Sequence, residues 1–185
     1  MQFARFVLHT QAFIFVADPF TMPDIIGKLP PQLQTMLQPY LKIAQRRRAV
    51  ESLNSIIDIF KSYHRYSDEA RLPDTPIAIM LSKADLLKGF NPPNSYRFMT
   101  NPPYGSNLDL KDINVVDAEV RAFLQACNQG DLLATTNKFK QVKFFATSAT
   151  GEPPDGNGLY SKVEPCRCLD PVLWILHRLG IIRAK

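Results

Sequence analysis

Three apolar runs occur along the chain, at residues 12–17, 77–81 and 142–146, and Lys143 interrupts the third. Each run is typical of a strand that is covered on both faces of a sheet. Between them, apolar residues recur at helical spacing over residues 32–66 and 115–127, and again after Asp170. Because strands that alternate with helices indicate parallel crossovers, the pattern predicts an α/β fold with a parallel sheet of about three strands and flanking helices.

Several residues should interrupt or begin these elements. We expect Pro39 to kink or split the first helical segment near its start. Thr21 and Asp170 are the predicted N-cap residues of two helices, because short polar side chains favour that position. Residues 90–107 contain Asn-Pro-Pro twice, a composition that extends neither a helix nor a central strand, so we predict a proline-rich surface loop there.

The composition indicates a soluble globular domain and argues against nucleic-acid-binding and membrane-spanning proteins. The chain has 185 residues, of which 45% are hydrophobic and 21% charged, as expected for a single soluble domain. The net charge of +5 is mild, and the basic run Arg46–Arg48 lacks interleaved aromatic residues, which argues against nucleic-acid binding. No apolar stretch reaches the ~18–20 residues that cross a bilayer. The three cysteines do not form a disulfide framework, so we expect a cytoplasmic protein.

Two polar strings directly follow the second and third apolar runs, and they carry the candidate chemistry. They are Ser82-Lys83-Ala84-Asp85 and Thr147-Ser148-Ala149-Thr150-Gly151. A carboxylate at the end of a strand can accept hydrogen bonds from both N1–H and N2–H₂ of guanine. Adenine presents a lone pair at N1, so the same carboxylate would reject it. Asp85 stands in the position for this role, and the small side chain of Ala149 would let backbone approach a base.

In this order and context, the two strings resemble the guanine-reading motifs of Ras-like GTPases, Asn/Thr-Lys-x-Asp and Ser-Ala-x. The resemblance implies that Asp85 reads the base edge, that Lys83 lies across the base and that the backbone N–H of Ala149 reads O6. It also implies that Ser148 orients its loop around Asp85. The implied guanine-binding set is therefore Ser82, Lys83, Asp85, Ser148, Ala149 and Thr150. Serine at position 82 replaces the usual Asn or Thr, which weakens the bracing contact that Asn would make.

The whole pattern resembles the carboxyl-terminal half of a GTPase-like domain from bacterial double-GTPase proteins. The resemblance implies a single partial domain over residues 1–185, with an incomplete three-layer Ras-like P-loop NTPase fold and GTP or GDP as ligand. No Gly-x-x-x-x-Gly-Lys-Ser/Thr phosphate loop occurs in the sequence. We therefore predict no magnesium site and no catalytic residue, interpret Asp18 as a turn former, and expect that the isolated chain does not hydrolyse GTP.

The resemblance also implies that the strand at residues 12–17 lacks its neighbour. An apolar strand edge with unpaired N–H and C=O groups recruits another chain or aggregates. We therefore expect a protein partner, or a missing amino-terminal half, at this edge. Three interpretations remain open: a guanine-nucleotide-binding fragment, an inactive GTPase-like interaction module, and an unrelated α/β domain in which Ser82–Asp85 merely closes a strand.

Overall fold

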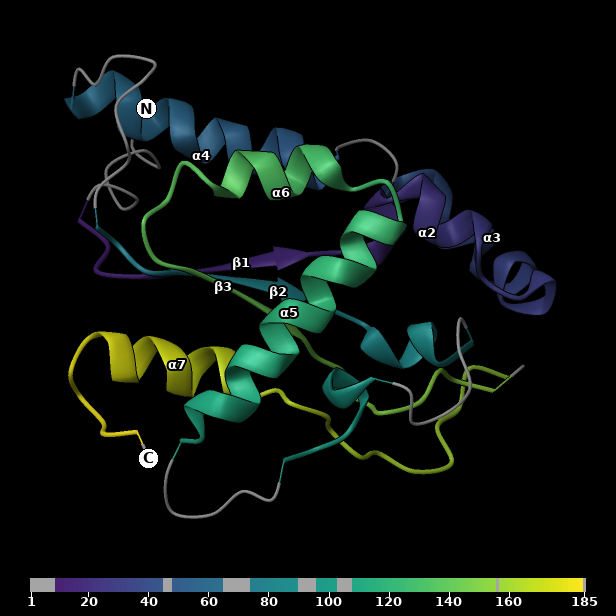
Figure 1. Cartoon of the computed structure of the whole chain (residues 1–185). Helices are drawn as coiled ribbons and strands as arrows, with labels where there is room; N and C mark the ends of the chain where they lie inside the picture. The colour runs from purple at the N-terminus through teal and green to yellow at the C-terminus, as the bar shows by residue number, and fades with distance from the viewer. Residues whose placement is uncertain are drawn as a thin grey trace.

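The computed structural model of the chain describes residues 9–44, 48–64, 74–89, 96–102, 108–155 and 157–184. Its centre is a parallel sheet in the order β1-β2-β3, with strands Phe13–Ala17, Ile77–Leu81 and Val142–Ala146. These three strands and their parallel arrangement confirm the predicted α/β class. Helices cover both faces of the sheet (Figure 1).

The larger core lies on the face of the sheet that carries Phe15, Ile79 and Phe144. The helices α4 (Ala49–His64), α5 (Leu110–Ala126) and α6 (Gly130–Thr136) pack on this side. Alternate residues of each strand point to one face, and here those residues are large and apolar. Their burial against α4 and α5 is the main reason that the three runs form a sheet.

A smaller core lies on the opposite face, under α7 (Asp170–Arg178). Phe145 of β3 meets Trp174 of α7 with ring centroids 6.1 Å apart. Ile113, near the start of α5, belongs to the same cluster, so α5 contributes to both cores along the β3 side. Among the described helices, α7 contacts all three strands on this face, and Figure 1 shows it below the sheet.

The helical region between β1 and β2 differs from its prediction. α3 (Pro31–Ala44) continues as a helix through Pro39, and the next described helix, α4, begins at Ala49. The first helix therefore ends at Ala44, after Pro39 and not at it. A proline removes one helical hydrogen bond. Leu37 of α3 is buried against Phe20, and this packing helps to keep the segment helical despite that loss.

Both predicted N-caps are displaced. Asp18 caps a short 3-10 helix, η1 (Pro19–Thr21), by accepting a hydrogen bond from the N–H of Phe20 at 3.0 Å. The helix α2 (Pro23–Gly27) then follows Met22, so Thr21 is not its cap. Asp170 is the first residue of α7 rather than its cap, because its carboxylate bonds to Arg167 at 2.7 Å. Asp18 is thus a turn-forming residue.

The predicted proline-rich loop is partly anchored in the core. Of residues 90–107, the structure describes 96–102, which include the 3-10 helix η3 (Arg97–Met99). Phe98 is fully buried and meets Phe123 of α5 with ring centroids 6.1 Å apart. This part is therefore not a surface loop. Burial of the large aromatic ring of Phe98 holds it in the core, although the surrounding prolines are typical of exposed loops. The remaining residues of the loop lie outside the described part of the chain.

The start of α5 and the whole of α6 differ from the sequence-based prediction. α5 begins at Leu110, where Asp109 caps it by accepting from the N–H of Lys111 at 2.9 Å. The short helix α6 was not predicted. In the described part of the chain, no helix is long and apolar enough to cross a membrane.

Candidate functional site

The two polar strings meet at the carboxyl ends of β2 and β3. These strands are neighbours, with Leu81 beside Ala146, so the residues after them emerge at one edge of the sheet. The hydroxyl of Ser148 donates to Asp85 Oδ1 at 2.6 Å, and both residues are buried. The N–H of Gly151 in turn donates to Ser148 Oγ at 2.8 Å. The expected convergence of Ser148 on Asp85 is therefore present.

The loop after β3 is held in shape from three sides. Ser148 and Cys166 exchange two backbone hydrogen bonds, of 3.0 and 2.8 Å. Lys88 donates to the carbonyl of Gly151 at 2.5 Å. Gly151 has a φ of +82°, and a Cβ there would lie 2.2 Å from the carbonyl oxygen of Glu164. Glycine is thus the residue type that this turn requires.

Two groups at this site retain unused hydrogen-bonding capacity. Ser148 occupies one oxygen of Asp85, and the other, Oδ2, has no hydrogen-bond partner among the described residues. Ala149 is exposed, and its N–H is likewise unpaired within the described part of the chain. Thr150, which is half-buried, uses its carbonyl to accept from Glu164 at 2.8 Å. The rim therefore offers one acceptor and one donor from neighbouring loops.

Lys83 points to the end of β1. Its ammonium group forms an ion pair with Asp18 and lies 4.4 Å from the ring centroid of Phe20. The lysine has a φ of +54°, a conformation that costs energy for a residue with a side chain. Ser82 is tied to the same strand, because its N–H donates to the carbonyl of Ala17 at 3.0 Å. The pairing of Lys83 with Asp18 was not predicted.

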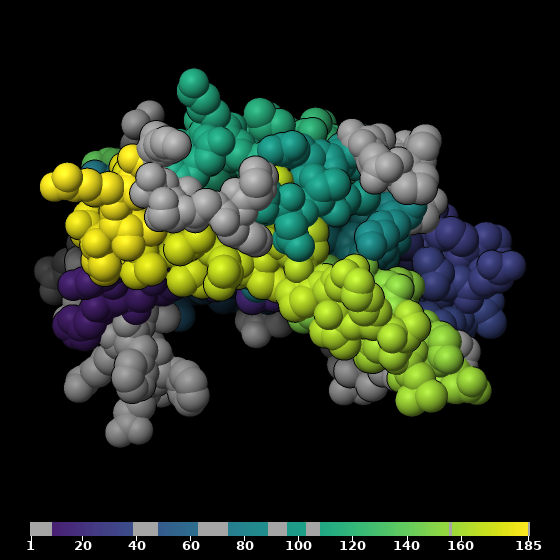
Figure 2. Space-filling model, turned by 90° about the horizontal axis from the view of Figure 1, so that it is seen from below, coloured from purple at the N-terminus to yellow at the C-terminus, as the bar shows by residue number. Residues whose placement is uncertain are grey.

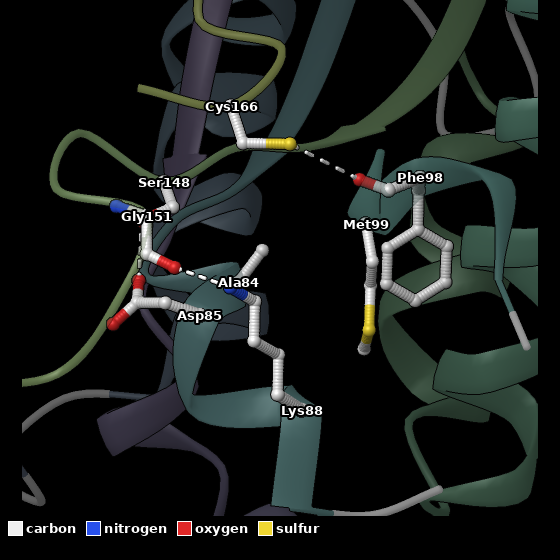
Figure 3. Close-up of a pocket in the computed structure, with 8 residues that line it drawn as sticks. All are labelled: Ala84, Asp85, Lys88, Phe98, Met99, Ser148, Gly151 and Cys166. Atoms are coloured by element: carbon white, nitrogen blue, oxygen red, sulfur yellow. Dashed lines mark hydrogen bonds between the residues drawn. The ribbon is translucent and has the colours of Figure 1, made fainter. Parts of the chain in front are cut away.

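Beneath the rim lies a small cavity, shown in Figure 3. Asp85, Ser148 and Gly151 line one side of it, and Phe98 and Met99 line the other. Its volume of about 10 Å³ is roughly the room that one water molecule needs. A purine ring cannot enter this cavity. A base that contacts Asp85 and Ala149 would have to lie on the open rim.

A buried arginine supports the segment that pairs with Ser148. Arg167 is 1% exposed and has a φ of +51°. Its guanidinium group donates to Asp112 at 2.8 Å and to Asp170 at 2.7 Å, which connects α5 with α7. Burial by itself would raise the pKa of Asp112, but hydrogen bonds from Arg167 and Arg97 lower it below its ordinary value.

Arg167 is not among the residues that the sequence pattern predicts to be buried or functional. It stands between two cysteines, in a segment without periodicity, so no local signal marks it as buried. All three cysteines are unpaired, and burial raises their thiol pKa. In the described residues, no group of three His, Cys, Asp or Glu side chains could hold a metal ion.

The chain is similar to a known protein of a bacterium. The chain is 26% identical, over an alignment 196 positions long, to the proposed ESX-1 scaffolding and assembly protein SaeC of Mycolicibacterium smegmatis. The match covers 96% of this chain and 46% of the relative, so the chain spans about half the length of that protein. No family model matches the chain, and no solved structure matches it.

Proposed function

We propose that this chain is a partial GTPase-like domain that binds a guanine nucleotide through its base. The observation that carries the proposal is the hydrogen bond from Ser148 to Asp85, which joins two loops 63 residues apart at one rim of a parallel sheet. It leaves Asp85 Oδ2 and the N–H of Ala149 unpaired among the described residues. Both groups are needed to read guanine.

The chemistry of the rim favours guanine over adenine. Asp85 Oδ2 and the remaining lone pair of Oδ1 can accept from N1–H and N2–H₂, while a backbone N–H donates to O6; adenine reverses the pattern at N1 and C6. Bidentate reading of this kind discriminates bases by ~1–3 kcal/mol in DNA recognition. We therefore assign the base to Asp85 and Ala149, the loop support to Ser148 and Thr150, and the flanking wall to Ser82 and Lys83.

The proposed ligand is GTP or GDP, bound without a magnesium site in this chain. Positioning and charge stabilisation of the phosphates account for nearly all of phosphoryl transfer. The sequence contains no Gly-x-x-x-x-Gly-Lys-Ser/Thr loop to provide them. We therefore expect weak nucleotide binding and no GTP hydrolysis by the isolated chain, and we place the domain in the cytoplasm.

A nucleotide titration with a donor–acceptor swap tests the proposal. We expect fluorescent GDP to bind in preference to fluorescent ADP. Asp85→Asn should reverse the preference toward xanthosine diphosphate, because the Asn amide donates to the C2 carbonyl of xanthine. The carbonyl oxygen of the new amide would still accept from Ser148, so the loop should stay folded. Asp58→Asn, an exposed position on α4, is the matched control and should change nothing.

Equal binding of GDP and ADP, or a preference that Asp85→Asn leaves unaltered, would refute the guanine site. Circular dichroism of both variants separates this result from loss of fold.

A second candidate function is a catalytically inactive GTPase-like module for protein interaction. One specific observation favours it: β1 is an outer strand, and two of its apolar side chains, Ile14 and Val16, are exposed. The description of the M. smegmatis relative as a scaffolding and assembly protein agrees with this function. The partner would be another protein or a missing amino-terminal half at the strand 12–17 edge. Tight partner binding without any nucleotide binding would favour this candidate over the first.

A further inference from the structure

The outer edge of β1 presents unpaired backbone groups. Phe13 donates its N–H to Pro76 at 2.9 Å, and Ala17 accepts from Ser82 at 3.0 Å, so the odd-numbered residues of β1 face β2. The N–H and C=O groups of Ile14 and Val16 therefore point away from the sheet. No described segment pairs with them. Each of the two residues offers one donor and one acceptor to a further strand.

The same two residues also expose their side chains. Ile14 is 41% and Val16 is 54% exposed, on the face of the sheet that α7 covers. Figure 2 shows the purple residues of the β1 region beside the yellow residues of α7. Leu169 and Val172, at the start of α7, are exposed as well. A helix that is apolar on its outer side is typical of one that another element covers.

None of the usual protective devices occurs within β1. Soluble proteins shield open edges with charged residues, proline or a bulge. The strand Phe13–Ala17 contains no charge and no proline, and it pairs with β2 without interruption. The edge is thus both apolar and ready to accept a strand.

We propose that a second copy of this chain pairs with β1 in antiparallel fashion, across a twofold axis at Phe15. In this register Ile14 of each copy lies opposite Val16 of the other, and the two pairs exchange four backbone hydrogen bonds. Phe15 occupies the central pair that makes none, because its backbone groups face β2. Two three-stranded sheets become one sheet of six strands.

The arrangement of β1 fits a second copy in particular. The outward groups and the exposed side chains both fall at one residue on either side of Phe15, so the strand is self-complementary, as a twofold interface requires. The register brings Phe13 opposite Ala17 and Ala12 opposite Asp18, so no like charges meet. The axis keeps both α7 helices on one face, with the exposed Ile and Val side chains of both copies between them.

Analytical ultracentrifugation of the purified chain tests the proposal. We expect a reversible dimer between about 1 and 100 μM, the range of a small strand-edge interface. Val16→Lys should weaken association by about tenfold or more, because it buries an unpaired charge between the two β1 strands. Val115→Lys, at an equally apolar position on α5 that is 49% exposed, should leave the dimer intact. Circular dichroism verifies that both variants fold.

Cysteine cross-linking tests the register independently. Opposed residues of a hydrogen-bonded antiparallel pair have Cα atoms ~5.5 Å apart, within the range of a disulfide. A mixture of Ile14→Cys and Val16→Cys chains should therefore cross-link faster than either variant alone, with the unmodified chain as the background for its own cysteines. A chain that stays monomeric throughout would overturn the proposal and leave the edge to a strand of another protein. A dimer that survives Val16→Lys and shows no mixed cross-link would overturn it as well.

Discussion

The two outer strands of the sheet end it in different ways. At β3, Asp117 of α5 accepts a hydrogen bond from the N–H of Phe144 at 2.8 Å, so a side chain takes the place of a further strand. Asp117 is itself held by Lys143 at 3.0 Å and Arg121 at 2.9 Å. At β1, no described side chain takes that place for Ile14 or Val16.

This difference shows that a side chain caps part of one outer edge of the sheet, whereas no described side chain caps the other. On the β3 side, the carboxylate of Asp117 accepts from the N–H of Phe144, and two cations neutralise that carboxylate. Arg121 also lies 4.2 Å from the ring centroid of Phe144, which shields the strand. On the β1 side, apolar side chains and open backbone groups favour association. The following changes test whether α5 and its carboxylates are what close the β3 edge.

The largest effect is expected from Arg167→Met. This change removes the Arg167 guanidinium group from the buried carboxylates of Asp112 and Asp170, of which Asp112 keeps its ion pair with Arg97, and it breaks the ionic link between α5 and α7. Removing one partner of a buried ion pair typically costs ~3–5 kcal/mol. Urea unfolding should show a loss of that order. Arg178→Met, an exposed arginine on α7, is the control and should change stability by less than about 0.5 kcal/mol. A loss below about 1 kcal/mol for Arg167→Met would contradict the anchoring role.

A smaller effect is expected from Asp117→Ala. The N–H of Phe144 would lose its acceptor, and a buried unpaired N–H costs ~1–3 kcal/mol. Asp117→Asn keeps an acceptor and should recover most of this stability, since Lys143 and Arg121 are partly exposed and can be hydrated. Urea unfolding of the three chains measures both effects. If Ala and Asn were equally destabilising, the ion pairs rather than the edge cap would be responsible.

The smallest effect is a dependence on acid. The pKa of Asp112 is lower in the folded chain than its ordinary value, so the unfolded chain binds this proton more tightly. The stabilisation is therefore present above the unfolded pKa of about 4 and disappears as the pH falls through the folded pKa. Asp112→Asn should flatten this part of a urea-midpoint profile. A profile with the same acid slope in both chains would assign the loss to other carboxylates.

The loops that form the candidate site could be predicted from the sequence, because they follow two apolar runs. Apolar runs located β2 and β3, and the resemblance to GTPases implied that Ser148 orients its loop around Asp85. That the two strands are neighbours came only from the structure. The pairing of Lys83 with Asp18 could not be predicted, because it depends on how β1 and β2 align. The small cavity beneath the rim depends on Phe98, which a proline-rich setting had suggested to be exposed.

The sequence by itself determined the three strands, their parallel direction and the residues that follow each one, because these depend on hydrophobic runs and on the helical segments between them. The tertiary structure alone decided which polar residues are buried and which strand edge is closed. Arg167 and Asp117 owe their roles to partners 55 and 27 residues away. Such contacts exist only after the helices dock, and no local pattern encodes them.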